Sequence, residues 1–447
     1  MRNLSLIFLL VLQSCHGGQK ILRETSNLQN FLHGSGSMLS RVSKADRETL
    51  HTVVFAILPL NMQELTNVLN DVSDPMSANY GKHWTKQKVA ELTTNKRGYE
   101  ATMQFLKSFE GVRVLHQTIH GEYIRASAPV HIWEDIFETT FREYEIKTKA
   151  AMSPRTVIRS ERYSLPIELH DHILTVFNTV QFAPDNLLTN IRLGSTQQNS
   201  ATASQNGNDG IIAGSVTPAL INRYYNVSNN NITSTATQAV FESLNSSYCS
   251  PSDLRLFQKY FNLTVHPISQ DIGGHAFNDS CVYEDGYICG EANLDVQYIM
   301  GVAENVDTIY DYNNVTGDDW MLGWITNVAN SPNPSQVYSI SYTSYEFTYT
   351  ASYLTAFDNE AIKLGVMGTT ILAASGDNGV AGSLATNDPY YCGYSPGFPS
   401  SSPYVVCVGG TNVSACFIID ILLLFCKFCY HEGTCYGKAR GGVSIIL

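Results

Sequence analysis

The stretch TAFDNEAIKLGVMGTTILAASGDNG, residues 355–379, decides the fold class of the second half of the chain. Its apolar residues follow a helical period over Thr355–Leu364, and Thr369–Ala374 is then a continuous apolar strand that ends in the turn Ser375–Gly379. A strand that ends in a glycine-rich turn is a frequent place for a functional site. A plain turn, in which Asp377 caps its own backbone, explains the same residue types without chemistry.

The same alternation of strand and helix continues on both sides of this stretch. Helical patterns occupy Leu254–Phe261, Ala292–Val302 and Trp320–Ala329, and strand patterns occupy Val306–Tyr310, Val337–Tyr342 and Tyr404–Val408. Regular alternation predicts an α/β fold: a parallel sheet with helices on both faces, whose sites gather at the carboxyl ends of the strands.

The first half of the chain predicts a separate α+β domain. A strand from His51 is followed by a helical face at Leu65, Val68, Leu69 and Val72, and similar patterns recur further on: a helix at Ala101–Phe109, strands at Val112–Ile119 and Tyr123–Ala128, and a helix at Ile132–Phe141. After Pro184 the composition changes, and residues 194–210 are almost free of large apolar side chains. Such a segment cannot bury enough surface to order itself, so it predicts an exposed linker, although a long surface loop is the alternative.

The amino terminus and the overall charge bound the class of protein. Arg2 precedes the apolar run Leu4–Leu12, and small or polar residues follow, which is typical of a secretory signal peptide over residues 1–17. The formal net charge of -12 gives no basic face for nucleic acid, so we expect no nucleic-acid partner. The apolar segment Cys416–Cys429 contains Asp420 and Lys427 and is shorter than the roughly 20 residues that span a bilayer, so we expect no membrane span.

Sequons and cysteines agree with export. Beyond the signal peptide, seven sequons begin at Asn226, Asn231, Asn245, Asn262, Asn278, Asn314 and Asn412. They predict a glycosylated surface in the secretory pathway, of a lysosomal or extracellular protein. Cys281 and Cys289 could bridge a loop in an oxidising compartment, although sequence does not fix disulfide pairing. Cys426 and Cys429 form a CxxC without a second matching pair, so we expect no zinc site there.

A pair of carboxylates lies in the first of the helical patterns after residue 280. The sequence GEANLDVQY, residues 290–298, places Glu291 and Asp295 four apart, so both side chains lie on one helical face. Two carboxyls at close range raise the pKa of one partner, which suits general acid/base chemistry at acidic pH. Most acidic pairs at this spacing are solvated surface, so the spacing alone does not assign a role.

Flanking motifs supply the missing context. The chain resembles the sedolisin family of serine-carboxyl peptidases, and its lysosomal tripeptidyl-peptidase branch in particular. The resemblance rests on EANLDVQY at Glu291–Tyr298, ASGDNG at Ala374–Gly379 and FPSSSPYVVCVGGT at Phe398–Thr411, with VSDPMSANYGKHWT at Val72–Thr85 as a propeptide signature. It covers about residues 47–411.

The resemblance implies a fold and an organisation. It implies a subtilisin-like parallel sheet, incomplete here, preceded by a ferredoxin-like α+β propeptide domain that inhibits the enzyme and helps it to fold. The expected segments are a signal peptide over 1–17, a propeptide domain over 18–190, a cleavable linker over 191–214, a partial peptidase domain over 215–414 and an unrelated tail over 415–447.

The resemblance also implies roles for individual residues. Glu291 would be the general base for a serine, Asp295 would orient and buffer it, and Asp377 would line the oxyanion hole as a protonated acid. Ser341, Tyr342, Ser375 and Gly376 would contact the substrate. Because a carboxylate replaces the usual histidine base, activity is expected only at acidic pH, on peptides or unfolded proteins.

Two departures from the family pattern stand out. The family nucleophile lies in Gly-Thr-Ser, but the Gly-Thr pairs at Gly368, Gly410 and Gly433 are followed by Thr370, Asn412 and Cys435. The family's calcium site would follow that serine, so calcium is expected for the family without ligands in this chain. Thr343 stands where the family has glycine, on the strand edge that pairs with substrate, and its Cβ would crowd the peptide.

Two functions remain open at this point. The first is the zymogen of an acid-acting serine-type peptidase, either a tripeptidyl peptidase or an endopeptidase. The second is a catalytically inactive product that acts as a propeptide-like inhibitor or binding module.

Overall fold

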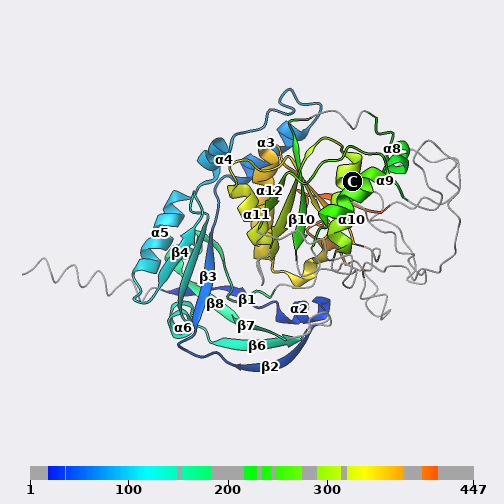
Figure 1. Ribbon diagram of the computed structural model, residues 1–447. Coiled ribbons are helices and arrows are strands. Elements are labelled where there is room, and N and C mark those ends of the chain that lie inside the picture. The colour runs from blue at the N-terminus through cyan, green and yellow to red at the C-terminus, as the bar shows by residue number, and fades with distance from the viewer. Residues whose placement is uncertain are drawn as a thin grey trace, which may run out of the picture. The chain divides into compact units, whose positions relative to one another are not determined.

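We describe a computed structural model of the chain (Figure 1). It describes residues 19–35, 37–147, 154–182, 216–228, 234–243, 248–273, 289–313, 320–376 and 395–410, together with 378 and 382. The chain forms two compact units. The first comprises residues up to Asn186 with Ile325–Asn330 and Phe347–Met367, and the second comprises the remainder. Each unit is considered by itself below.

The second unit contains the predicted parallel sheet. Six strands pair in the order β11-β12-β10-β13-β15-β17, and every pair between neighbours is parallel. Their bounds are β10 (Thr237–Ser243), β11 (Gln270–Ile272), β12 (Asp307–Asn313), β13 (Val337–Ile340), β15 (Thr370–Ala374) and β17 (Val406–Val408). The central strand β10 is buried along almost its whole length, as expected for a parallel strand covered on both faces.

Helices flank this sheet on both faces, as predicted. On one face Val240 of β10 packs with Leu254 of α9 (Pro251–Tyr260) and Val296 of α10 (Gly290–Val302). On the other face the ring of the next residue, Phe241, lies 5.0 Å from Trp324 of α11 (Trp320–Asn330). Successive residues of a strand point to opposite faces, so these two contacts define the two helical layers.

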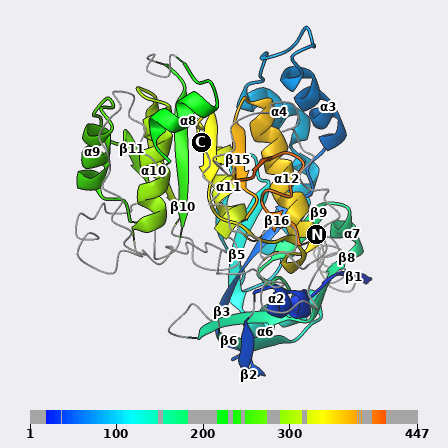
Figure 2. The same ribbon diagram turned by 90° about the vertical axis from the view of Figure 1, so that its right-hand side faces the viewer.

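The route of the chain around α10 is unusual. The connection β10–α9–β11 crosses the sheet in one direction and β11–α10–β12 returns in the other, yet α9 and α10 pack together on the same face (Figures 1 and 2). Parallel crossovers in opposite directions over one face have opposite hands, so one of these two is left-handed. Left-handed crossovers are rare in proteins. The second of these two crossovers, β11–α10–β12, contains α10 and so determines where its first turn lies.

The first unit contains a ferredoxin-like sheet, in agreement with the sequence-based expectation. Four antiparallel strands lie in the order β4-β5-β3-β9. They are β3 (Leu50–Ile57), β4 (Arg113–Gln117), β5 (Tyr123–Pro129) and β9 (Ile173–Phe177), with α3 (Met62–Ser73), α4 (Lys86–Thr93) and α5 (Lys96–Lys107) after β3 and α6 (Val130–Phe137) after β5. Phe55, Trp133 and Phe137 form the centre of its core, with the last two rings stacked 5.4 Å apart.

Additional strands extend this unit. β1 (Lys20–Thr25) pairs with β8 (Arg162–Pro166), and β2 (Met38–Lys44), β6 (Phe141–Lys147) and β7 (Arg155–Ser160) form a separate antiparallel sheet. The helices α2 (Leu28–Ser35) and α7 (Ile167–His170) complete it.

The helix α12 (Ala351–Val366) belongs to the first unit, although it precedes β15 in the chain. Ser352 near its start donates to Glu24 Oε1 at 2.5 Å, and Tyr123 donates to Glu360 Oε1 at 3.2 Å near its end. The backbone N–H of Trp84 donates to the carbonyl of Val366 at 2.9 Å. Residues of the N-terminal domain therefore contact α12 along its whole length.

One sequence-based expectation about an element was wrong, and some elements were not predicted. The helix predicted at Ile132–Phe141 ends at Phe137, because Glu138 adopts a left-handed conformation with φ 51° and Phe141 begins β6. The central strand β10 and the short helix α8 (Pro218–Tyr224) were not predicted. Most other predicted elements lie within a few residues of their observed bounds, as usual for sequence patterns.

Candidate active site

The first turn of α10 carries the predicted carboxylate pair. Cys289 is the residue before the helix and is disulfide-bonded, while its proposed partner Cys281 lies outside the described residues. Glu291 is half-buried and Asp295, one turn later, is 9% exposed. The helix therefore presents both carboxyls on the same side, as their spacing predicted, with Asp295 the deeper of the two.

Burial dominates the chemistry of Asp295. It raises the pKa of Asp295 from 3.8 to about 7, and the nearby Ser341 hydroxyl lowers it only in part. Among the residues that the structure describes, neither Asp295 Oδ2 nor Ser341 Oγ has a hydrogen-bond partner. The Ser341 hydroxyl therefore lies near the Asp295 carboxyl without forming a regular hydrogen bond to Oδ2. Asp295 is consequently protonated in mild acid and can hold a proton beside Glu291.

Tyr342 follows Ser341 and turns its side chain into the core. Its ring is fully buried, and its hydroxyl donates to Glu242 Oε2 at 2.5 Å from the end of β10. The Tyr342 ring also lies 5.7 Å from that of Phe241. Any contact of Tyr342 with a peptide would therefore come from its backbone rather than from its side chain.

The end of β15 continues into an exposed turn. The Ser375 N–H donates to the Val408 carbonyl at 2.9 Å, and its side chain is exposed. Gly376 has φ 91°, a conformation that side chains other than glycine rarely adopt. Asp377, the proposed oxyanion residue, lies outside the described residues. The structure thus places Ser375 and Gly376 at a strand end but does not relate Asp377 to Glu291.

Thr343 occupies the space between two chain segments. Its Oγ1 donates to the carbonyl of Phe398 at 3.3 Å, and a Cβ built on Gly397 would lie 2.3 Å from that oxygen. A Cβ on Gly376 would lie 3.5 Å from Thr343 Cγ2. Thr343 is 4% exposed, so its side chain packs between the Gly376 turn and β16 (Gly397–Phe398).

Two buried carboxyls of this unit were missed by sequence reasoning. Glu242 is fully buried at the end of β10. Asp311 on β12 accepts from Trp324 Nε1 at 2.8 Å, and burial, opposed only by that bond, raises its pKa from 3.8 to about 6. The available signal was an acidic residue inside an apolar strand, which is uncommon unless the residue is paired.

Two of the seven predicted glycosylation sites are described. Asn226 and Asn262 are both exposed, and both have φ 54° in turns that follow helices. The remaining five, Asn231, Asn245, Asn278, Asn314 and Asn412, lie outside the described residues.

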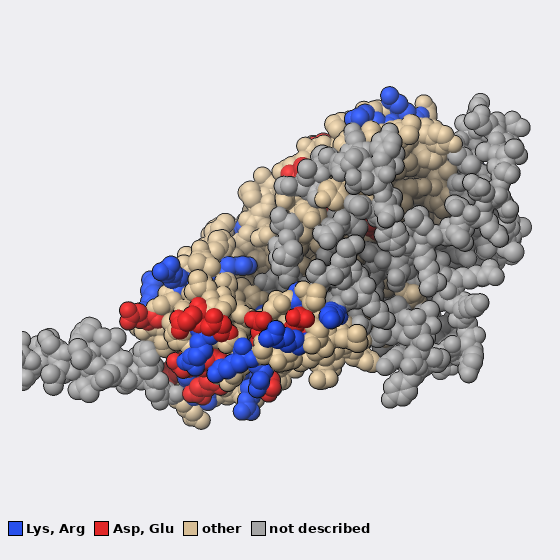
Figure 3. All heavy atoms as spheres, turned by 60° about the horizontal axis from the view of Figure 1, so that its bottom comes forward, with Lys and Arg blue, Asp and Glu red and all other residues tan. Residues whose placement is uncertain are grey.

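Other classes of site were sought over the described ranges. No group of three or more His, Cys, Asp or Glu side chains is arranged there to hold a metal ion, and no helix is long and apolar enough to cross a bilayer. A hollow of about 660 Å³ in the first unit is lined by basic and acidic side chains that pair with each other, such as Lys20 with Glu138 at 3.3 Å and Arg47 with Glu134 at 3.5 Å. Figure 3 shows the two signs of charge intermixed over one face.

Parts of the chain are similar to known proteins. Residues 37–182 match the family model "Pro-kumamolisin, activation domain". Tripeptidyl-peptidase 1 of Pan troglodytes is 28% identical over 393 residues, which cover 85% of this chain and 64% of that protein. Physarolisin of Physarum polycephalum is 27% identical over 439 residues, which cover 93% of this chain and 66% of that protein. These matches support the resemblance of the chain to the sedolisin family.

A solved structure also matches part of the chain. Pseudomonas sedolisin, described as a serine-carboxyl proteinase, matches with a TM-score of 0.34 at 24% identity, over 43% of this chain and 53% of that one. The chain spans about 64% of the length of the tripeptidyl-peptidase 1 relatives that it matches. The match to the activation domain falls inside the N-terminal domain that holds α12, and we call residues 37–182 the activation domain from here on.

Proposed function

We propose that this chain is part of the zymogen of an acid-acting serine-type peptidase of the sedolisin family. The observation that carries the proposal is Asp295, a buried carboxyl one helical turn from Glu291 whose pKa lies near 7. The printed names of the relatives, a tripeptidyl-peptidase and a serine-carboxyl proteinase, support the same reaction class.

The proposed mechanism divides the work between the two carboxyls. Ionised Glu291, as general base, removes the proton from a serine hydroxyl while that oxygen attacks the peptide carbonyl. Asp295 is neutral when protonated, so it adds no negative charge beside Glu291. It also holds the Glu291 side chain in position. Asp377 in its neutral form would donate a hydrogen bond to the developing oxyanion. We assign the nucleophile to no residue of this chain, because none of its Gly-Thr pairs is followed by serine.

The remaining assignments are part of the same proposal. Ser341, Ser375, Gly376 and the backbone of Tyr342 contact a peptide or unfolded protein, and the activation domain blocks this site until the linker over 191–214 is cut. The signal peptide and sequons support a lysosomal or extracellular location. Calcium is proposed for the complete protein only, with no ligand assigned among these residues.

A second candidate is an inhibitor without catalysis. It is favoured by the absence of Gly-Thr-Ser in these 447 residues. In this reading the activation domain binds the peptidase domain of a related chain.

One experiment separates the two candidates. The 447-residue chain and any longer product of its gene are assayed between pH 3 and 7 on a tripeptide with a free amino terminus and a fluorescent leaving group. Acid-dependent release that is lost in Glu291→Gln supports the peptidase. Absence of release from every product, with inhibition of an active relative by the added chain, supports the inhibitor instead.

A further inference from the structure

A buried histidine lies inside the activation domain, far in sequence from the carboxyl pair. His51 on β3 is 8% exposed, and its Nε2 lies 2.7 Å from the carbonyl oxygen of Asn178. Its ring packs 5.2 Å from that of Phe141, and its own carbonyl accepts from Trp133 Nε1 at 2.9 Å. His51 is therefore fixed in the core by contacts with β6, α6 and the segment after β9.

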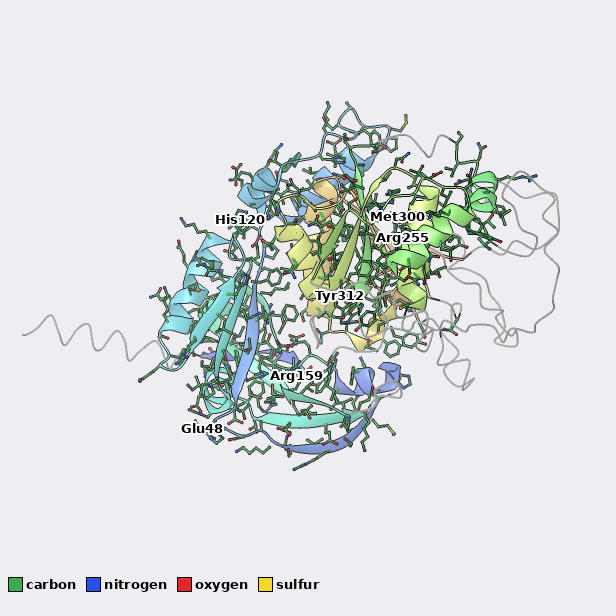
Figure 4. All side chains as sticks on the ribbon, in the orientation of Figure 1. Glu48, His120, Arg159, Arg255, Met300 and Tyr312 are labelled. Carbon is green, nitrogen blue, oxygen red and sulfur yellow. The ribbon has the colours of Figure 1, made fainter. Side chains whose placement is uncertain are left out.

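An arginine shares the same pocket. Arg159, labelled in Figure 4, is 5% exposed and extends from β7. Its guanidinium donates to the carbonyl of Gln181 at 2.7 Å and to Asn178 Oδ1 at 3.2 Å. Asn178 thus contacts both side chains, His51 through its backbone carbonyl and Arg159 through its side chain. A positive charge is held beside the imidazole by this shared residue.

These contacts fix the protonation state of His51 at neutral pH. An imidazole nitrogen that faces a carbonyl oxygen must carry the hydrogen, so neutral His51 is protonated at Nε2 and takes up a further proton at Nδ1. Burial, together with the charge of Arg159, lowers the pKa of His51 from 6.5 to about 4, although the Asn178 carbonyl partly opposes them. The facing side chains of Ala128 from β5, Phe141 from β6 and Trp133 from α6 do not titrate, and Arg159 is the charged group that acts on the ring.

We propose that His51 and Arg159 form an acid sensor that opens the core of the activation domain and so releases it when the pH falls. The inference rests on the proposed function, because it explains how the zymogen would lose its inhibitor in an acidic compartment. Protonated His51 would place a second positive charge next to Arg159 in a space that excludes water. Opening the sheet hydrates both charges and removes this cost.

The direction of the effect follows from the lowered pKa. A histidine whose pKa is lower in the folded domain than in the open one stabilises the closed form above pH 6.5, and this contribution is lost as the pH falls towards 4. With pKa values of 6.5 open and about 4 closed, the ratio of open to closed domain rises about 30-fold between pH 7.5 and pH 5 from this group alone.

The contact between the activation domain and α12 responds differently to acid. Lys363 on α12 lies 2.9 Å from Glu360 and 3.8 Å from Glu122 of the activation domain. Burial raises the pKa of Glu360, whereas the pKa of Glu122 stays below its usual 4.5 because Lys363 and Thr118 outweigh its burial. Acid therefore neutralises Glu360 before Glu122, and Glu122 keeps its charge beside Lys363 to lower pH than Glu360 does.

Hydrogen exchange measured by mass spectrometry tests the sensor on the full chain. The chain carries Glu291→Gln, so that no processing contributes, and exchange is normalised for the intrinsic pH dependence of each amide. Peptides covering β3 and β5 should show an opening ratio about 30-fold higher at pH 5 than at pH 7.5. In His51→Gln, the glutamine side-chain N–H can still reach the Asn178 carbonyl. In this variant the opening ratio should rise less than about 3-fold between pH 7.5 and pH 5. His116→Gln, an exposed histidine on β4, is the matched control and should behave like the parent chain.

A second measurement needs no variant. Exchange at the C2 hydrogen of each imidazole reports its pKa in the parent chain, and His51 should titrate near pH 4. The proposal is overturned if His51 titrates at pH 6 or above, if the parent shows no pH-dependent opening, or if His51→Gln retains the full rise. None of these readouts requires catalysis, so failure of the sensor is distinguishable from failure of the proposed peptidase.

Discussion

Lys363 Nζ lies 2.9 Å from Glu360 Oε1, and both side chains are almost completely buried. They occupy successive turns of α12, and Glu122 Oε1 of the activation domain approaches the same ammonium at 3.8 Å. A buried charge of this kind is tolerated only with its partners in place. The three residues therefore couple the stability of α12 to the presence of the activation domain.

Replacing Lys363 by methionine should destabilise the chain strongly. The substitution keeps most of the aliphatic volume but leaves the buried Glu360 and the partly buried Glu122 without their cation, and loss of a buried partner typically costs about 3–5 kcal/mol. The free energy of unfolding from urea titration at pH 7 measures the change.

The matched control is Lys96→Met, which removes an exposed pair with Glu100 at 3.8 Å. Exposed pairs of this type contribute on the order of 0.5 kcal/mol or less. Equal shifts for the two variants would show that burial of Lys363 has no energetic consequence.

Removal of the Tyr342 hydroxyl should destabilise the sheet of the second unit. In Tyr342→Phe the buried Glu242 carboxylate loses a 2.5 Å hydrogen bond while the ring packing with Phe241 stays. A buried hydrogen-bond acceptor that loses its donor costs about 1–3 kcal/mol. Glu242→Gln in the same background should recover part of the loss, because a neutral amide is easier to bury. A stability of Tyr342→Phe equal to that of the parent would contradict this role.

Asp311→Asn should stabilise the chain at neutral pH and not in acid. The pKa of Asp311 is raised from 3.8 to about 6, so its contribution to stability is fully present below pH 3.8 and is lost as the pH rises through 6. The asparagine can still accept from Trp324 Nε1, and its gain at pH 8 should reach at most about 3 kcal/mol.

Thermal unfolding followed from pH 3.5 to 8 measures this dependence. Asp307→Asn, at an exposed position of the same strand, is the control and should leave the profile unchanged. An Asp311→Asn profile parallel to that of the parent would mean that Asp311 titrates normally.

Gly397 and Thr343 should show strong energetic coupling. Gly397→Ala places a Cβ 2.3 Å from Thr343 Oγ1, whereas the next contacts are 3.5 and 3.6 Å away. The single variant should lose about 1–3 kcal/mol. Thr343→Ala removes the obstructing oxygen and costs only the bond to Phe398, about 0.5–1.5 kcal/mol.

A double-mutant cycle by urea unfolding tests the pair. The double variant should be more stable than Gly397→Ala alone. Additive losses would show that Thr343 does not fill the space beside Gly397.

The sequence predicted those elements whose pattern is local. The pattern predicted α12 within four residues of its bounds and β15 within one, and the carboxyl spacing on α10 required only that the helix form. The end of α6 was mispredicted because Phe137 and Phe141 are both buried at helical spacing, although Phe141 faces the core from a strand.

The interactions that join distant segments could not be predicted from local pattern. Tyr123 and Glu360 are 237 residues apart, and nothing near either residue signals the other. The same holds for Tyr342 and Glu242, 100 residues apart. For His51, the strand was predicted, but the low pKa depends on burial and on Arg159, and only the folded domain supplies both.

The central claim is that Glu291 is the base of an acid-acting peptidase. The most direct test is the rate of tripeptide release between pH 3 and 7 by the active product of this gene and by its Glu291→Gln variant. Glutamine has nearly the same size as glutamate, so the variant differs from the parent only in this carboxyl group. We predict activity confined to acidic pH and a loss of at least about 100-fold in the variant. Activity that survives Glu291→Gln would contradict the account.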